Sequence, residues 1–124
     1  MTFDERVSIN ERIDAMIGSY VDFKESIKDM ELSDRINAQD KYNKLREKLF
    51  KIAEMSGEKA LTLTLIQDGN TATGVTANGK KFVWTANSGY AYRSRYCGSL
   101  YIAEIGTVFT SGTVAKAFEY ILNN

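Results

Sequence analysis

A stretch without acidic residues lies between Asp68 and Glu104, and it holds side chains that could bind an anion. Aromatic rings stack on nucleobases, and the guanidinium fork of arginine matches two phosphate oxygens. Both kinds of side chain occur together in this stretch, with two lysines, and the combination predicts a binding site for a nucleotide. The stretch contains Lys80, Lys81, Phe82, Trp84, Tyr90, Tyr92, Arg93, Arg95 and Tyr96, of which we take Phe82, Trp84, Tyr92, Arg93 and Arg95 as candidate ligand contacts.

Two short polar clusters could complete such a site. Thr110, Ser111 and Thr113 precede an apolar helical pattern, and the free N–H groups of a helix start attract anions. Asn87 and Ser88 stand in a predicted turn and could offer an amide and a hydroxyl group. Each cluster also has a plainer interpretation, because Ser and Thr commonly cap helices and Asn-Ser-Gly segments commonly form turns.

Packing alone could also explain the aromatic residues, since strands favour them. Side chains alternate between the two faces of a strand, so Tyr90, Tyr92 and Tyr96 share one face while Arg93 and Arg95 share the other. The tyrosines and the arginines therefore cannot line one flat surface together. At least one of the two sets must belong to the core or to an interface.

The composition argues against catalysis. The chain has no histidine, so the usual proton-transfer residue, the common nucleophile–histidine pairs and most zinc sites are missing. We therefore expect no catalytic residue, no bound metal and no cofactor. A nucleotide-cleaving enzyme that uses a carboxylate such as Glu104 remains as an alternative.

The pattern of apolar residues in the first half of the chain predicts helices. A capping-box pattern at Ser8 and Glu11 predicts a helix start near Ile9, and an apolar stripe then continues to Ile27. A break is predicted near residues 32–34, where Ser33 or Asp34 could cap a second helix that ends at Gly57. We predict that residues 1–57 form an antiparallel helical hairpin, an arm whose apolar stripes could serve oligomerisation.

The second half, residues 58–124, has the two-residue period of strands. Asp68-Gly69 and Asn78-Gly79 are hairpin signals. The pattern predicts an antiparallel meander followed by a C-terminal helix, with strands at about 60–67, 71–77, 80–86, 90–97 and 99–105. The predicted fold class is therefore α+β, in one compact unit whose second part binds the ligand.

The charge balance and the apolar pattern limit the partners and the location. A formal net charge of zero is unlike the strongly basic domains that bind DNA or RNA duplexes. The sequence has no apolar run long enough to predict a membrane span, and its first residues do not have the pattern of a signal peptide. The single cysteine, Cys97, excludes an internal disulfide. We expect a cytoplasmic protein whose partner is a small molecule.

A long helical arm, an aromatic and arginine-rich meander around Lys80–Tyr96, and a C-terminal helix after Thr110–Thr113 together resemble the first-described phage Thoeris anti-defence family. The resemblance implies a sponge that encloses a cyclic ADP-ribose isomer made by a bacterial TIR-domain enzyme and does not degrade it. It also implies a homodimer or larger homo-oligomer in the cytoplasm of the bacterial host, with cyclic oligonucleotides as further ligands.

The expected function is thus non-catalytic sequestration of a cyclic nucleotide immune signal. The alternative is a phage inhibitor that binds a bacterial defence protein through the helical arm.

Overall fold

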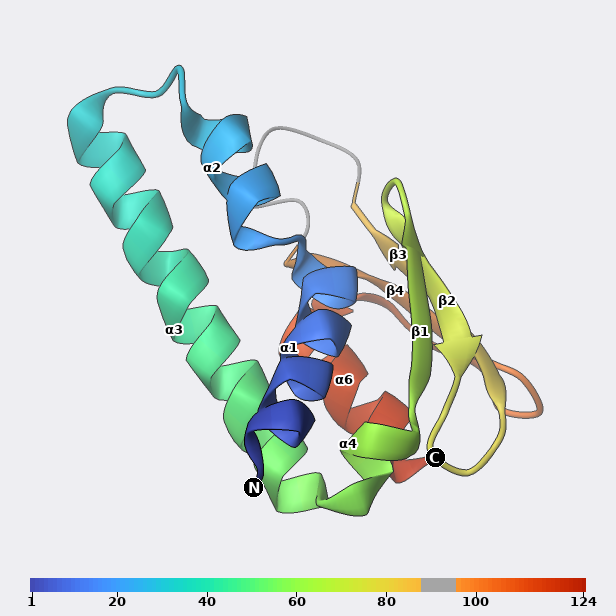
Figure 1. Ribbon diagram of the computed structural model, residues 1–124. Coiled ribbons are helices and arrows are strands. Elements are labelled where there is room, and N and C mark those ends of the chain that lie inside the picture. Colours follow the sequence, from blue (N-terminus) through green and yellow to red (C-terminus); the bar gives the residue numbers. More distant parts are fainter. Residues whose placement is uncertain (88–95) are drawn as a thin grey trace.

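The computed structural model describes residues 1–87 and 96–124, and it has an α+β fold (Figure 1). Helices α1 (Phe3–Ile17), α2 (Tyr20–Ile27), α3 (Leu32–Ser56) and α4 (Glu58–Thr62) come first. Strands β1 (Thr64–Asp68), β2 (Thr71–Val75), β3 (Lys81–Ala86), β4 (Cys97–Ile102) and β5 (Gly106–Thr113) follow, and helix α6 (Val114–Asn123) ends the chain. The predicted fold class is confirmed.

The predicted helical hairpin differs from the structure at three points. The first helix begins at Phe3 with Thr2 as its N-cap, earlier than the predicted start near Ile9. The apolar stripe is not one helix, because Gly18 adopts a φ of 91° and Ser19 caps a new helix, α2. The second long helix, α3, starts after Glu31, so neither Ser33 nor Asp34 is its cap.

The predicted end of the second helix at Gly57 agrees with the structure. Helix α3 ends at Ser56, and Gly57 with a φ of 60° returns its N–H to the carbonyl groups of Ala53 and Glu54. Figure 1 shows α2 and α3 side by side and running in opposite directions. Helix α2 and the first part of α3 lie together at the end of the molecule away from the chain termini.

In the described ranges, five strands form one antiparallel sheet in the order β1-β2-β3-β4-β5. The turns at Gly69 and Gly79 both have positive φ and lie where hairpins were predicted. Three strand predictions were wrong or cannot be compared. Residues 60–62 belong to α4 rather than to the strand predicted at 60–67. The strand predicted at 99–105 lies at 97–102, and the predicted strand 90–97 lies mostly outside the described residues. Strand β5 was not predicted at all.

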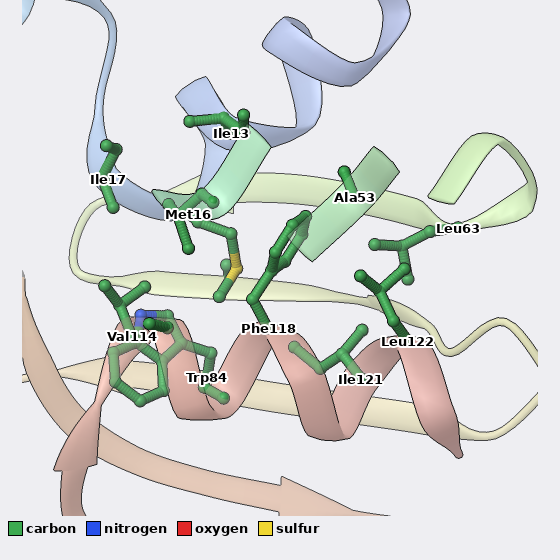
Figure 2. Close-up of a cluster of buried hydrophobic side chains, with 14 of the residues drawn as sticks. Ile13, Met16, Ile17, Ala53, Leu63, Trp84, Val114, Phe118, Ile121 and Leu122 are labelled. Atoms are coloured by element: carbon green, nitrogen blue, oxygen red, sulfur yellow. The ribbon is translucent and has the colours of Figure 1, made fainter. Parts of the chain in front are cut away.

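The core lies between the inner face of the sheet and the helices. Figure 2 shows Met16 of α1, Ala53 of α3, Trp84 of β3 and Phe118 of α6 converging in one cluster. This continuous core joins the helical half to the β half, because residues from both contribute to it. The opposite face of the sheet is open: the cross-strand row Ile66, Thr73, Val83, Tyr101 and Thr107 points away from the helices, and Ile66 is 71% exposed.

Candidate functional site

Phe82 and Trp84 are buried, so neither ring is open to a stacked base in this structure. Both lie on the inner face of β3, and each is only 1% exposed. Trp84 packs edge-on against Phe109 with ring centroids 6.3 Å apart. The assignment of these two rings as stacking partners for a base is therefore corrected: helices cover them, and they stabilise the core instead.

The predicted anion site at the start of the last helix is also corrected. Thr110 and Ser111 belong to strand β5, and only Thr113 stands at the start of α6. The Thr113 hydroxyl accepts a hydrogen bond from the backbone N–H of Lys116 at 3.2 Å, which is the plain capping role. A hydroxyl cluster at the helix start is therefore not formed.

The remaining predicted contacts are not brought into a site by the described part of the chain. Asn87 is exposed at the end of β3, and its backbone N–H donates to the carbonyl of Cys97 at 2.9 Å. Ser88, Tyr92, Arg93 and Arg95 lie outside the described residues. The arginine contacts accordingly stay a prediction.

A different site lies between helices α2 and α3. The opening, which we call the α2–α3 groove, has a volume of about 330 Å³ and falls within the range of small-molecule pockets. Its walls combine cationic, amide and apolar side chains from both helices. They are Lys24, Ile27, Lys28, Leu32, Arg35, Ile36 and Gln39.

The charged side chains that line this groove are all positive. Lys24, Lys28 and Arg35 line it, and no carboxylate does. Lys28, the C-cap residue of α2, forms an ion pair with Glu25 of that helix, so a ligand would have to compete for the Lys28 ammonium group. The Nε atom of Arg35 is buried and has no hydrogen-bond partner among the described residues. An unpaired guanidinium N–H that is withdrawn from water favours an anionic acceptor.

Tyr20 lies beside the groove and contacts two of the residues that line it. The Nζ atom of Lys24 lies 5.1 Å from the centroid of this ring, and Gln39 Nε2 donates to the Tyr20 hydroxyl at 3.1 Å. Tyr20 is 44% exposed, so part of its ring faces solvent. An exposed ring beside a lysine is a surface on which a base can stack.

Buried aromatic contacts fix the position of α2 against α3. The rings of Phe23 and Tyr42 are stacked, with centroids 4.1 Å apart and planes 5° from parallel. Ile27, one turn later, is 4% exposed and seals the same seam. These residues hold the inner faces of the two helices together, which leaves the cationic residues at the outer opening.

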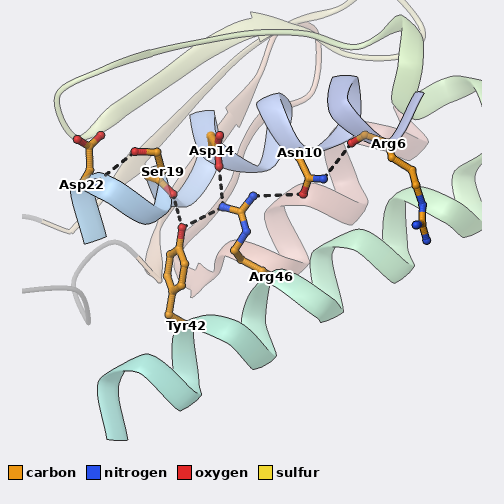
Figure 3. A network of polar contacts seen from close by, with 8 residues as sticks. Arg6, Asn10, Asp14, Ser19, Asp22, Tyr42 and Arg46 are labelled. Atoms are coloured by element: carbon orange, nitrogen blue, oxygen red, sulfur yellow. Dashed lines mark hydrogen bonds and ion pairs between the residues drawn. The ribbon is translucent and has the colours of Figure 1, made fainter. Parts of the chain in front are cut away.

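A polar network anchors the start of α2 (Figure 3). Tyr42 donates to the carbonyl of Gly18 at 2.8 Å, and Arg46 Nη1 donates to Tyr42 at 2.9 Å and to Asp14 at 2.6 Å. Arg46 Nη2 reaches Asn10 at 3.2 Å. Burial raises the pKa of the Tyr42 hydroxyl above its ordinary value, although the neighbouring Arg46 acts in the opposite direction. The network ties α1, the break at Gly18 and α3 together.

Comparison with known proteins did not identify a family for this chain. No protein-family model matches the chain, and neither the curated proteins nor the solved structures searched gave a match. Within the described ranges, no group of three or more His, Cys, Asp or Glu side chains is placed to hold a metal ion. No helix there has the length and apolar character required to cross a bilayer.

The sequence did contain a signal for the groove. Lys24 and Lys28 are four residues apart on one predicted helix, and Arg35 and Gln39 are four apart on the next. A four-residue step places each pair on one face of its helix. Because a short connection makes the two helices antiparallel neighbours, the pairs could have been expected to face one opening.

Proposed function

We propose that this protein is a non-catalytic binding protein that sequesters a small nucleotide-like anion in the α2–α3 groove. The observation that carries the proposal is the lining itself: Lys24, Lys28 and Arg35 line the groove together with apolar side chains, and no carboxylate is among the lining residues. Cations suit phosphate groups, while Tyr20 and Ile36 offer surface to a base or ribose.

The contact energies reach useful affinity only if the groove is held rigid before the ligand binds. A hydrogen bond to a charged group contributes about 1.5–3 kcal/mol, so three cations give a gross sum of about 5–9 kcal/mol. One stacked base adds about 1–3 kcal/mol. Micromolar to nanomolar binding requires about 8–12 kcal/mol net. The fixed seam between Phe23 and Tyr42 supports such affinity, since a rigid site loses less entropy on binding.

The finer proposal is that the ligand is a cyclic nucleotide immune signal, such as a cyclic ADP-ribose isomer, and that the protein acts in the cytoplasm of a bacterial host as a phage counter-defence factor. Its support is the order of elements, a helical hairpin, an antiparallel meander and a final helix, which resembles the Thoeris anti-defence family. The lack of histidine fits this role, because sequestration requires no proton transfer.

A thermal-shift panel tests the proposal. Cyclic ADP-ribose isomers and cyclic di- and trinucleotides are added separately, and a ligand at one hundred times its Kd stabilises the folded state by about 2.7 kcal/mol. We expect a shift of several degrees with at least one ligand. The double variant Lys24→Gln/Arg35→Gln should lose it, while the control Lys48→Gln/Lys51→Gln, on the exposed far half of α3, should keep it.

Two results would contradict the proposal. One is no shift with any nucleotide, and the other is an equal shift in the groove variant and the control. Heating the loaded protein and analysing the released ligand separates sequestration from catalysis. Intact ligand supports sequestration, and cleavage products would support the carboxylate enzyme.

A second candidate function has its own observation. The outer surface of the arm exposes apolar side chains, with Val21 75%, Leu32 65% and Ile36 57% exposed. A contiguous exposed apolar patch often marks a protein interface. An inhibitor that binds a defence protein through this surface would be disabled by Val21→Glu, at a residue that does not line the α2–α3 groove, whereas a nucleotide sponge with this substitution would still bind its ligand.

A further inference from the structure

A small cavity lies between the last turn of α1 and the β1–β2 hairpin. Its walls are Ala15 and Met16 of the helix, hairpin residues on either side of Gly69, and Trp84 of β3. It has a volume of about 10 Å³, counted as the space open to the centre of a water-sized sphere, so it has room for one water molecule and not for an organic ligand. It shares no lining residue with the α2–α3 groove.

Trp84 brings an unpaired hydrogen-bond donor to this cavity. The side chain is 1% exposed, and its Nε1 atom is buried with no hydrogen-bond partner among the described residues. In Figure 2 the nitrogen of the Trp84 ring lies on the side toward Met16, which also lines the cavity. An indole N–H can only donate, and buried donors in folded proteins are nearly always paired with a protein acceptor or with ordered water. The donor of Trp84 therefore requires an acceptor at this place.

The strand register places a second polar group near the indole. Gln67 of β1 pairs with Ala72 of β2, and Ala72 pairs with Trp84, so the three residues form one row across the sheet. Gln67 is half-buried on the inner face, whereas its neighbours Ile66 and Asp68 are exposed. Adjacent strands lie about 4.8 Å apart, which separates the Cα atoms of Gln67 and Trp84 by roughly 10 Å. Because the residue between them has only a methyl group, space remains between the two longer side chains.

We propose that this cavity binds one ordered water molecule, which accepts a hydrogen bond from Trp84 Nε1 and bridges it to the side-chain amide of Gln67. Cavities that stay dry have apolar walls, whereas a buried water is held where two or more polar groups converge. Here the wall includes the indole, the Gln67 amide and the polar residues Asn70 and Thr71. The water satisfies the buried N–H and connects β1 to β3 across Ala72. This assignment does not depend on ligand binding in the α2–α3 groove.

Magnetic resonance can detect this water directly at the indole proton. Trp84 is the one tryptophan of the sequence, so the isotope-labelled protein gives a single indole N–H signal. A water held beside this proton should give a ROESY cross-peak of opposite sign to the diagonal, because dipolar contact has that sign while chemical exchange has the sign of the diagonal. A long-lived water should also give a NOESY cross-peak with the sign of the diagonal, unlike the short-lived water of the protein surface.

Two variants of the β1–β2 hairpin test the role of Gln67. Gln67→Leu removes the amide and keeps a side chain of similar size, so both cross-peaks should be lost. Thr73→Val is the matched control: it also replaces a polar side chain of this hairpin, but Thr73 is exposed on the outer face of the sheet. The control should keep both cross-peaks. The dispersion of the amide signals shows whether each variant is folded.

A crystal structure gives a second measurement that requires no variant. One isolated density peak should lie within about 3.2 Å of Trp84 Nε1 and of an amide atom of Gln67. The absence of a dipolar cross-peak between water and the indole proton of the wild-type protein would overturn the proposal. So would cross-peaks of equal intensity in Gln67→Leu and in wild type, or a protein atom found in the place of the water.

Discussion

The hydroxyl of Tyr42 donates a hydrogen bond to the backbone carbonyl of Gly18 at 2.8 Å, which joins the middle of α3 to the break between α1 and α2. Gly18 is buried and has a φ of 91°, a conformation that a residue with a side chain rarely adopts. The bond thus fixes the point at which the chain changes direction. Helix α2 begins two residues after Gly18, so this hydrogen bond ties the start of α2 to α3.

Replacing Tyr42 with phenylalanine should lower the free energy of unfolding by about 1–2 kcal/mol, since the buried Gly18 carbonyl and one N–H of Arg46 lose their partner. Urea denaturation measures this loss. The control is Tyr101→Phe, because Tyr101 is 48% exposed on the outer face of the sheet and should change stability by less than about 0.5 kcal/mol. Equal losses in the two variants would show that the Tyr42 bond does not stabilise the break.

Stability should fall at high pH partly because of Tyr42. Burial, its largest cause, raises the pKa of this hydroxyl in the folded protein, so the folded state keeps the proton at pH values where the unfolded state has lost it. The contribution of Tyr42 is therefore full below about pH 10, the ordinary tyrosine value, and is lost as the pH rises above it. The stability gap between wild type and Tyr42→Phe should therefore narrow as the pH rises from 9 to 11. A constant gap would contradict this linkage.

The sequence predicted those parts of the fold that depend on local chemistry. Gly57 ends α3 and the Asn78-Gly79 turn joins β2 to β3, because positive φ angles are set by glycine itself. The break at Gly18 was missed because the apolar stripe continues through it in the same register. The alternation of Leu61, Leu63 and Leu65 fits a strand, yet Leu61 lies in helix α4. A run of three alternate leucines is too short to distinguish the two structures.

The candidate site was less predictable, since it depends on tertiary contacts. The aromatic residues correctly indicated a sheet, and the alternation of side chains along a strand placed Phe82 and Trp84 on the same face of it. Nothing in the local sequence indicated which face of the sheet the helices would cover. The Thr-Ser-Gly-Thr segment favoured a helix start, whereas pairing with β4 extends β5 as far as Thr113. The groove residues gave only two four-residue spacings, Lys24 to Lys28 and Arg35 to Gln39, and such spacings also occur on ordinary solvated helices.

The burial of Trp84 has a direct spectroscopic consequence. It is the one tryptophan of the sequence and is 1% exposed, so its emission should be blue-shifted and weakly quenched by acrylamide. Adding a nucleotide should change this emission little, because a ligand in the α2–α3 groove does not stack on Trp84. Strong quenching by the ligand, without unfolding, would restore the stacking role that the sequence suggested.

The final prediction concerns Thr113, the one residue of the predicted hydroxyl cluster that stands at a helix start. Thr113→Ala removes the acceptor for the Lys116 N–H, so the free energy of unfolding should fall by about 1 kcal/mol. Thr110→Ala, on an exposed strand position of the same segment, is the matched control and should cost less. Nucleotide affinity should be the same in both variants and in wild type, because a cap whose hydroxyl is already engaged is not the anion site. A tenfold loss of affinity in Thr113→Ala alone would instead return the ligand to the start of α6.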